Sequence, residues 1–590
     1  MPWALLHRPS IQLGSLKAFI EQYSSHRVDL YHPFLQVGRE LGDELYQQLA
    51  LNGWAGEALF VPLLFPKQSK QAARLFQSSI EMTETKQEKT DFPQLVTRLK
   101  RICSRWLETF DPSNLLLVGF SVCFYQFLPS LFLARQLKAI YPELPIVFGG
   151  SGCNGEVGQS LLKAFPEIDF VVDGEGEIAL LGLANYLAGT TATLPDRVLT
   201  RTQGTPATPT PLLKMAELPP PDYTPFFKEL ATSFAGAPFF PQLPVEFSRG
   251  CWWNRCTFCN LNQQWHGYRC KKHQQMATEI QQMAKQYGVL HFCFTDNALP
   301  EKEAAQLFTE LAATQIDFDF FGEIRATDSP KLLQDYRRGG LTTVQVGIEA
   351  LSASLLRRMC KGTTVMDNIL MMKLCSKFQI QLEGNLILQF PSSTEQEVME
   401  TIAHLDFILP FSPLQEARFF LGHGSPVHRN LHQYNIKATL PYTKFSQLLP
   451  AELIKKLTLP VHGYRGDLTH QRKLWKPVHK KLIAWSNFHR QRKKRHLNEP
   501  PLFFRDGADF LFIRQEQPDS PALHHRLRGL SRKLYLFCEL PQSIEAILNH
   551  FPSLKKDALN TFIKEMVNKR LMFQEDGKLL SLAVHLQNHS

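Results

Sequence analysis

Short apolar runs alternate with amphipathic stretches along the first 200 residues of the chain. The apolar runs predict strands at 28–31, 115–121, 146–149, 170–172 and 197–199, and segments such as LFLARQLKAIY and EVGQSLLKAF between them have helical periodicity. Strands that alternate with helices predict right-handed βαβ units around a parallel sheet. A Thr- and Pro-rich stretch at 189–225 follows and predicts a linker at a domain boundary.

A second alternating series begins at Pro244. Its apolar runs predict strands at 245–248, 290–296, 319–326, 343–350, 382–390 and 416–422, separated by helical segments such as KEAAQLFTELAATQ and EQEVMETIAHLDFI. Six strand–helix steps predict a partial (βα)6 barrel. By analogy with the full barrel, ligands are expected at the C-terminal ends of its strands.

The last 130 residues follow a different pattern. Residues 471–496 are basic with interspersed aromatic side chains, which predicts a solvated helix covering the barrel, or a contact with an acidic partner. Beyond them KLYLFCEL predicts a strand, SIEAILNHF and KKDALNTFIKEMVNKRL predict helices, and FQEDGKLLSLAV predicts a hairpin. Helix, helix and hairpin in this order are typical of a winged helix.

The patterns together predict an α/β protein of three folded units. We expect a Rossmann-like domain at 1–215, a linker at 216–240, the partial barrel at 241–460, a basic helical connector at 461–499 and a winged-helix-like α+β domain at 500–590.

Composition agrees with a packed globular protein. Of the 590 residues 44% are hydrophobic and 20% charged, which excludes a disordered chain, and a net charge of +10 is too small to indicate nucleic acid by itself. The apolar stretch between Asp111 and Arg135 is long enough to span a bilayer, but polar residues and Pro129 interrupt it, so we predict a buried strand, loop and helix. Without an export signal or a membrane span, the expected location is the cytoplasm.

Three of the eleven cysteines crowd into the segment SRGCWWNRCTFCNLN, directly after the first predicted barrel strand. Thiolates of Cys251, Cys256 and Cys259 in one loop can hold three irons of a 4Fe–4S cluster and leave the fourth iron open to another ligand. A tetrahedral zinc ion is the alternative, with Cys270 or His266 as its fourth ligand.

The position of this loop, with the aromatic Phe258 between its last two cysteines, resembles the radical S-adenosylmethionine (SAM) superfamily. Four residues separate Cys251 from Cys256, where the common motif has three. The resemblance implies that the open iron chelates SAM, which is cleaved to a 5′-deoxyadenosyl radical. It also implies SAM contacts at the ends of the later strands, from Asp296, Asn297, Glu323, Arg325, Gln345, Glu349 and Asn385.

In the N-terminal domain, LLLVGFSVCFYQF, IVFGGSGCN and DFVVDGEGEIAL are each a strand running into a Gly- and Ser-rich loop, where open α/β sheets bind ligands. This resembles the cobalamin-binding domain fused to many radical SAM proteins. It implies cobalamin contacts from Ser121, Val122, Gly149, Gly150, Ser151, Gly174, Glu175, Gly176 and Glu177. The Asp-x-His-x-x-Gly motif is absent, so no histidine ligand to cobalt is expected. A nucleotide-binding Rossmann-like domain is the alternative.

Further motifs, among them KGTT (361–364) and HGSP (423–426), are similar to those of radical SAM C-methyltransferases that mature ribosomally synthesised and post-translationally modified peptides (RiPPs). The resemblance implies methyl transfer to an unactivated carbon of a leader-bearing peptide, with an external electron donor and without a nucleic-acid partner. It assigns no general acid or base. Another radical SAM rearrangement or oxidation and a zinc-stabilised nucleic-acid-binding regulator stay open as alternatives.

Overall fold

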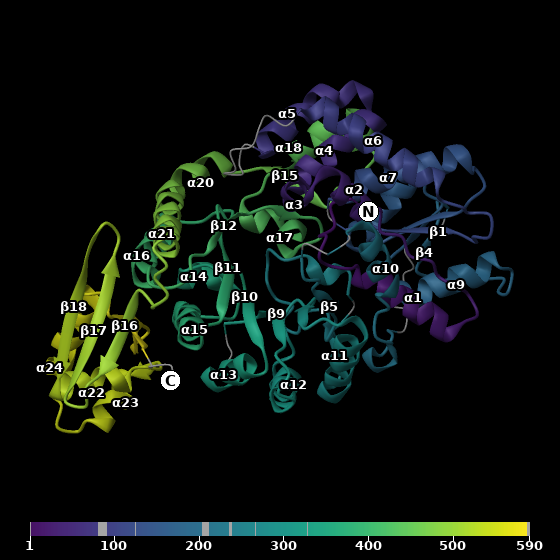
Figure 1. Ribbon diagram of the computed structural model, residues 1–590. Helices are drawn as coiled ribbons and strands as arrows, with labels where there is room; N and C mark the ends of the chain where they lie inside the picture. Colours follow the sequence, from purple (N-terminus) through teal and green to yellow (C-terminus); the bar gives the residue numbers. More distant parts are fainter. Residues whose placement is uncertain are drawn as a thin grey trace.

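The computed structural model describes residues 2–80, 91–123, 125–202, 212–234, 236, 239–265, 267–326 and 329–586. The N-terminal part (purple and blue) packs on one side of the central barrel (teal), and the C-terminal part (yellow) lies on the other side (Figure 1). The predicted α/β fold class is confirmed.

A four-stranded sheet forms the centre of the N-terminal part, in the order β1 (Val118–Ser121), β2 (Ile146–Gly149), β3 (Phe170–Val172) and β4 (Val198–Leu199). The first three strands are parallel, and β4 pairs antiparallel with β3 at the edge. Helices α7 (Phe127–Ile140), α8 (Gly155–Ala164) and α9 (Gly176–Leu187) connect them. The prediction of a strand at 28–31 is wrong: this segment pairs with no strand among the described residues, because it lies along a cavity.

A layer of helices covers this sheet and was not recognised from the sequence. It consists of α2 (Pro33–Leu41), α3 (Asp43–Leu51), α4 (Gly53–Leu64), α5 (Ser69–Ile80) and α6 (Phe92–Glu108), while α1 (Ile11–Tyr23) packs against α9. Helix α4 is buried along most of its length. Two segments from later in the chain join the hydrophobic core of the N-terminal part. They are α10 (Thr224–Ser233), within the predicted linker, and α18 (Thr443–Leu448) with the following α19 (Ala451–Ile454). The segment predicted as a linker is therefore partly helical and packed.

The second sheet has six strands, all parallel, as predicted for a partial barrel. They are β5 (Leu243–Val245), β8 (His291–Phe294), β9 (Asp319–Ile324), β10 (Leu341–Glu349), β11 (Gln381–Leu388) and β12 (Gln415–Arg418). The intervening helices are α11 (His273–Tyr287), α12 (Glu301–Ala313), α13 (Pro330–Arg338), α14 (Ala353–Arg358), α15 (Val365–Phe378) and α16 (Glu395–Ile408). Strands β5 and β12 lie at opposite ends of the sheet order, so the barrel is open.

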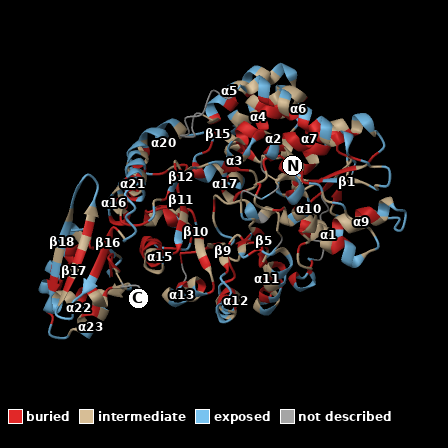
Figure 2. Ribbon diagram, viewed as in Figure 1, coloured by how far each residue is buried: buried red, intermediate tan, exposed pale blue. Residues whose placement is uncertain are grey.

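After the barrel, a small antiparallel sheet has the strand order β13 (Leu421–Gly422), β15 (Val461–Arg465) and β14 (Ala438–Pro441). Helix α17 (Pro426–Arg429) follows β13 in the chain. The basic stretch forms α20 (Leu468–Leu474) and α21 (Lys476–Lys494). Figure 2 shows α21 with both buried and exposed residues, and its Val478, Leu482 and Trp485 join the barrel core. The basic helix therefore covers the barrel, as expected.

The C-terminal part begins with a sheet that the sequence did not indicate: β16 (Leu502–Asp506), β17 (Phe510–Gln517) and β18 (Ser520–Arg528), joined at one edge by β22 (Val584–His585). Then follow α22 (Gly529–Phe537), β19 (Gln542–Ser543), α23 (Ile544–His550), α24 (Lys556–Asn568) and the hairpin β20 (Met572–Glu575) to β21 (Lys578–Ser581). The strand predicted for KLYLFCEL is wrong, because this apolar run belongs to α22 and buries Leu534 and Tyr535 on one helical face. No described helix is long and apolar enough to cross a membrane.

Candidate functional site

The three-cysteine loop lies between two short strands that close its base. Strand β6 (Ser248–Arg249) precedes the loop and pairs antiparallel with β7 (Arg269–Cys270) behind it. Gly250 turns the chain into the loop with φ of +82°, and an added Cβ there would lie 2.5 Å from the carbonyl oxygen of Gly267. Only glycine fits this turn without moving the backbone.

The loop is docked on the segment that links β10 to α15. The amide of Thr257 donates to the carbonyl of Met359 at 3.0 Å, and the indole Nε1 of Trp253 donates to the carbonyl of Cys360 at 2.8 Å. Gly362 leaves room for this indole, since a Cβ there would lie 2.1 Å from it. These contacts fix the loop before any metal binds.

The thiols of Cys251, Cys256 and Cys259 are all partly exposed. Burial raises the pKa of Cys256, although the charges of Lys361 and Arg325 lower it, and burial raises the pKa of Cys259 to about 11. The free thiols of Cys256 and Cys259 are therefore protonated near pH 7, and a metal centre that binds them must displace their protons.

The spacing of the thiols bears on the kind of metal. Among the described residues, the one group of three or more potential ligands with ligand atoms all within 4.8 Å of one another is a set of histidines elsewhere. Ligand sulfurs on one tetrahedral zinc ion would lie about 3.8 Å apart. The cysteines are thus spread more widely than a single zinc requires, which fits a larger cluster. His266, one of the two residues weighed as a fourth zinc ligand, lies outside the described residues, and Cys270 lies on β7.

Inside the barrel, polar side chains form a row across three neighbouring strands. Gln345 on β10 is in register with Glu323 on β9 and with Glu383 on β11, so all three lie on one face of the sheet. Burial, with the nearby charges of Glu349 and Asp296, raises the pKa of Glu323 to about 7. Asn385 lies on the same face, two positions beyond Glu383. Glu383 was not predicted, although the alternation in QLEGNLIL would have indicated it.

Two further residues expected at the SAM site lie beside the cysteine loop. Arg325 is buried, and its guanidinium lies 5.2 Å and 4.3 Å from the ring centroids of Trp252 and Trp253. It also donates to the carbonyl of Lys361. Glu349 pairs with the Lys361 ammonium at 3.2 Å, and Gly347 leaves the space that this lysine occupies.

Asp296 faces the first strand instead of an open site. It is 2% exposed, accepts a hydrogen bond from the amide of Phe247 at 3.1 Å and another from the hydroxyl of Ser248. Burial raises its pKa to about 7, against the effect of these donors. In this structure its carboxyl group therefore ties the end of β8 to the start of the cysteine loop. The adjacent Asn297 does line a cavity.

That cavity has a volume of about 890 Å³ and lies between the N-terminal sheet and the base of the cysteine loop. Its volume is near the upper end for small-molecule sites. All the residues predicted for cobalamin except Val122 line it: Ser121, Gly149, Gly150, Ser151, Gly174, Glu175, Gly176 and Glu177. Arg249, Gly250 and Gln264 line it from the barrel side.

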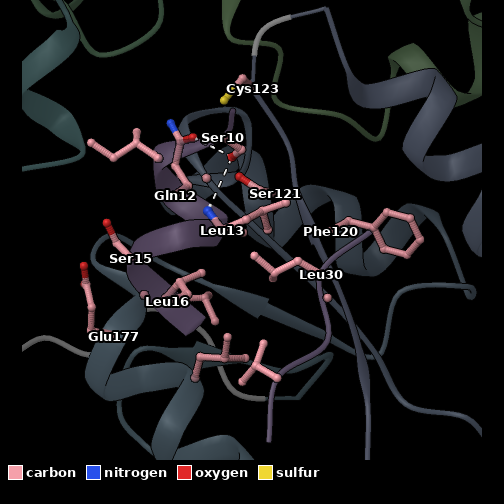
Figure 3. A pocket seen from close by; sticks show the side chains of 18 of the residues that line it. Ser10, Gln12, Leu13, Ser15, Leu16, Leu30, Phe120, Ser121, Cys123 and Glu177 are labelled. Atoms are coloured by element: carbon pink, nitrogen blue, oxygen red, sulfur yellow. Dashed lines mark hydrogen bonds between the residues drawn. The ribbon is translucent and has the colours of Figure 1, made fainter. Parts of the chain in front are cut away.

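Val122 does not line this cavity: its side chain joins the N-terminal core and lines a smaller cavity beside Trp54. Successive side chains on an extended chain face opposite ways, so Ser121 and Val122 cannot line the same side. Another wall of the cavity comes from α1 and the segment before it, where Figure 3 shows Ser10, Gln12 and Leu16. None of these residues was among those predicted to contact cobalamin.

Glu175 and Glu177 also hold the N-terminal domain to the barrel. Arg249 lies 2.9 Å from Glu175, 2.5 Å from Glu177 and 2.9 Å from Glu246. Burial opposes the charge of Arg249, but Glu246 and Glu177 raise its pKa above the ordinary value. The two carboxylates therefore face the cavity edge and neutralise a buried cation next to Cys251.

Residues 245–405 match the model of the radical SAM superfamily. This part of the chain is a radical SAM domain. It contains the three-cysteine loop and β8 to β11, so the resemblance expected from the position of this loop is confirmed for this segment.

Two relatives are similar to this chain at 27% identity. One is an uncharacterized methyltransferase of Pyrococcus horikoshii, aligned over 371 residues that cover 60% of this chain and 76% of that protein. The other is the anaerobic magnesium-protoporphyrin IX monomethyl ester cyclase of Rubrivivax gelatinosus, aligned over 289 residues that cover 45% of this chain and 49% of the cyclase. The chain thus spans about half the length of the cyclase.

Solved structures of similar fold extend beyond the radical SAM domain. The cobalamin-dependent S-adenosylmethionine radical enzyme OxsB, with aqua-cobalamin and SAM bound, matches 95% of this chain and 69% of its own at 13% identity and a TM-score of 0.53. The radical SAM methyltransferase TsrM of Kitasatospora setae matches 66% of this chain and 82% of its own at 17% identity and a TM-score of 0.49. The likeness to OxsB shows a shared fold of the radical SAM domain together with its N-terminal neighbour.

Proposed function

We propose that this protein is a cobalamin-dependent radical SAM enzyme that methylates an unactivated carbon of a ribosomally made peptide. The observation that carries the proposal is the cavity of about 890 Å³ where the glycine loops of the N-terminal sheet meet the base of the cysteine loop. The names of two similar proteins support it, since one is a methyltransferase and OxsB is cobalamin-dependent with cobalamin and SAM bound.

The proposed site needs three cofactors, and the residues present fit them. A 4Fe–4S cluster with SAM would supply a 5′-deoxyadenosyl radical, and cobalamin would supply the methyl group. Cys251, Cys256 and Cys259 would hold the cluster, and the glycine loops let the backbone approach a large ligand closely. The row of Glu323, Gln345 and Glu383 offers hydrogen-bond acceptors toward SAM inside the barrel.

The balance of the reaction defines what must be measured. One C–H bond of the substrate breaks, one C–CH3 bond forms, and the substrate hydrogen leaves on 5′-deoxyadenosine. One SAM gives that product and a second gives S-adenosylhomocysteine. Cleavage of the first SAM to methionine and the radical would consume one electron, and the return of cobalamin to its methyl-accepting state would consume a second, so an external electron donor belongs to the proposal.

A peptide substrate fits the exposed edge strand β18. This strand pairs on one side only, with β17, and leaves its other side free among the described residues. His524, Arg526 and Arg528 alternate along it as exposed basic side chains. An extended peptide can add to such an edge through main-chain hydrogen bonds, so we place leader recognition there.

The test uses the full chain after anaerobic reconstitution with iron and sulfide, supplied with SAM, cobalamin, a reductant and short peptides encoded beside its gene. We expect 5′-deoxyadenosine, S-adenosylhomocysteine and a peptide heavier by one methylene unit. Replacing all three loop cysteines by alanine should abolish 5′-deoxyadenosine, whereas Cys360→Ala, at an exposed cysteine next to the loop's docking segment, should leave most of it.

Three outcomes separate the alternatives. Deoxyadenosine with an altered but unmethylated peptide would favour another radical rearrangement or oxidation. Absence of deoxyadenosine with reductant and peptide present would refute the radical step. Zinc without iron or acid-labile sulfide in the native protein would favour a zinc-stabilised regulator.

Peptide recognition by β18 has its own test. The double variant Arg526→Glu with Arg528→Glu should weaken binding of the same peptide, labelled with fluorescein, by at least tenfold and leave deoxyadenosine formation intact. The matched control reverses two exposed charges on the basic helices, Lys473→Glu with Lys480→Glu. If the control loses binding and the β18 variant does not, the leader binds the basic helices instead.

A further inference from the structure

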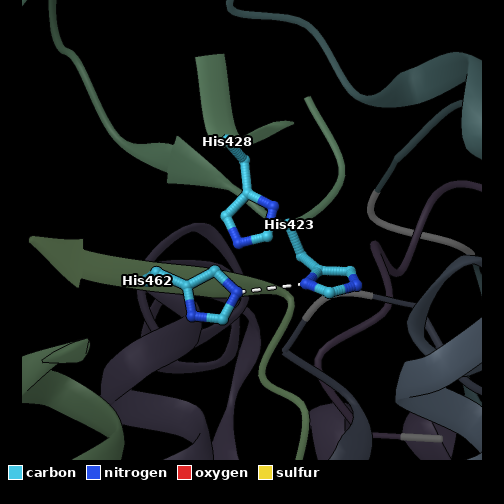
Figure 4. A group of neighbouring side chains, drawn as sticks. All are labelled: His423, His428 and His462. Carbon is cyan, nitrogen blue, oxygen red and sulfur yellow. Dashed lines mark hydrogen bonds between the residues drawn. The ribbon is translucent and has the colours of Figure 1, made fainter. Parts of the chain in front are cut away.

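Three histidines converge outside the radical SAM domain, beside the small antiparallel sheet (Figure 4). His423 follows β13, His428 lies in α17, and His462 lies in β15. The pairing of Leu421 with His462 brings β13 and β15 together. Each histidine offers one ring nitrogen, and the three nitrogens all lie within 4.8 Å of one another.

We propose that His423, His428 and His462 bind one zinc ion. Nδ1 of His423 lies 3.1 Å from Nε2 of His462. Two imidazole nitrogens on one tetrahedral zinc ion, each about 2.0–2.1 Å from the metal, lie about 3.3 Å apart. The side chains are thus already spaced as zinc ligands, with the fourth position left for water or another small ligand.

A carboxylate outside the trio supports this arrangement. Oε2 of Glu156, on α8 of the N-terminal domain, lies 3.3 Å from Nε2 of His423. Metal-binding histidines commonly donate their second ring N–H to a carboxylate, which fixes the tautomer and makes the ligand nitrogen more basic. Glu156 would hold the proton of His423 on Nε2 and leave the Nδ1 lone pair for the metal.

The other two rings are compatible with the same ion. The rings of His428 and His462 stack with their centroids 4.7 Å apart. The amide of Gly424 donates to Nδ1 of His428 at 3.2 Å, a long contact that a metal at this nitrogen would replace.

The position of the trio suggests what the ion would do. The side-chain amides of Asn260 and Gln263, just beyond Cys259, both donate to the carbonyl of His423. Glu156 contacts the same histidine from the N-terminal domain. A zinc ion would therefore fasten the end of the cysteine loop, the small sheet and the N-terminal domain to one point. This role is structural and independent of the chemistry proposed above.

The experiment measures zinc in the full chain after reconstitution of the iron–sulfur centre and removal of loosely bound metal. We expect one zinc per chain by elemental analysis, and a higher unfolding temperature when Zn²⁺ is added back. The variant His423→Gln with His462→Gln should lose this zinc and keep its iron. His525→Gln, another partly buried histidine with a lowered pKa, is the matched control and should keep both.

Two more variants distinguish zinc bound by the histidines from zinc bound by the loop cysteines. Glu156 is 77% exposed, so Glu156→Gln should fold, and it should weaken zinc affinity about 10–100-fold. The variant with all three loop cysteines replaced by serine should still bind one zinc. Zinc that disappears with the cysteines and persists without the histidines would overturn the proposal, as would less than a tenth of a zinc per chain in the native protein after Zn²⁺ is added back.

Discussion

Arg249 is the residue on which the N-terminal domain and the cysteine loop depend together. It is 4% exposed, contacts three carboxylates from two domains and directly precedes Gly250 and Cys251. Its guanidinium carbon also lies over the ring of Trp265, 5.2 Å from the ring centroid. Glu175 and Glu177 were predicted only as loop residues of a cofactor site, because the sequence does not show that a cation 74 and 72 residues away reaches them.

Replacing this cation should destabilise the whole chain. Arg249→Met leaves three carboxylates without their buried partner, and breaking a buried pair costs about 3–5 kcal/mol. We expect a clear drop in the unfolding midpoint in urea. Arg27→Met is the control, because Arg27 is 83% exposed in its pair with Asp29 and should change the midpoint little. Equal midpoints for both variants would show that the network contributes no stability.

The predicted SAM residues show what position at a strand end can and cannot reveal. Glu323 and Gln345 were predicted because they lie near the ends of predicted strands, and the structure puts them in register on one face of the sheet. Asp296 was predicted for the same reason, yet its carboxyl group turns back to bind the Phe247 amide. The turn after a strand decides which way such a side chain points, and position along the chain carries no information about that turn.

At the scale of elements, the loop between β2 and α8 depends on one backbone conformation. Gly150 has φ of 100° and ψ of 179°, a region that essentially only glycine adopts. An added Cβ would also lie 2.8 Å from the carbonyl oxygen of Val122. The sequence marked this glycine as part of a ligand loop, but the reason it must be glycine is the close approach of the chain after β1.

The variant Gly150→Ala should therefore lose cobalamin binding, measured by absorbance of the reconstituted and desalted protein, and lose about 1–3 kcal/mol of stability. Gly155→Ala, at the first residue of α8, is the matched control. Gly155 has φ of +53°, and nothing lies within 4 Å of an added Cβ, so it suffers strain without a clash. Full cobalamin occupancy in Gly150→Ala would contradict the assignment of this loop to the cofactor.

Helix α15 carries a buried lysine that joins the barrel to the C-terminal domain. Lys373 donates to the carbonyls of Glu539 and Ser581, each at 2.7 Å. Burial lowers its pKa to about 7, although Glu539 partly opposes this. The unfolded chain keeps the proton up to the ordinary value near 10.5, so the unfolded state binds more protons between about pH 7 and 10.5.

Stability contributed by this lysine should therefore rise as pH increases from 7 to 10. Other groups titrate in the same range, so the informative quantity is the difference in unfolding free energy between the native protein and Lys373→Met. We expect that difference to shift in favour of the native protein with increasing pH. A pH-independent difference for Lys373→Met would indicate that the amine stays charged.

Local sequence patterns identified strands that alternate with helices along the chain. They failed for apolar runs whose conformation depends on whether a partner strand is available. Most of the barrel strands were found because each is an apolar run that precedes a helix, whereas the strand predicted at 416–422 is divided between β12 of the barrel and β13 of the small sheet. Residues 28–31 have a similar run but no partner strand among the described residues. Most of KLYLFCEL belongs to α22, whose Leu534 and Tyr535 are buried in the core that this helix shares with its neighbours. Apolar content predicts burial, while the choice between helix and strand in short runs depends on what they pack against.

At the scale of the whole molecule, the barrel and the C-terminal domain share one hydrophobic core. Phe407 of α16 and Phe573 of β20 lie with ring centroids 5.3 Å apart. Glu575, also on β20, accepts hydrogen bonds from the first two amides of α15, at Val365 and Met366, where a helix favours negative charge. The sequence indicated a boundary near residue 500 but not this interface. An apolar face has the same sequence pattern whether it packs within its own domain or against a neighbouring domain.

Removal of residues 500–590 should consequently damage the barrel as well as the tail. The truncated chain would expose the faces of α15 and α16 and leave Lys373 without its two carbonyl partners. We expect it to bind a hydrophobic dye, to unfold at a lower temperature and to lose iron after reconstitution. Loss of peptide binding in such a truncation would then say little about leader recognition, and for this reason charge reversal on β18 is the sharper test. If the truncated chain keeps the native unfolding temperature and full iron, the two units are independent and the shared core contributes nothing to the barrel.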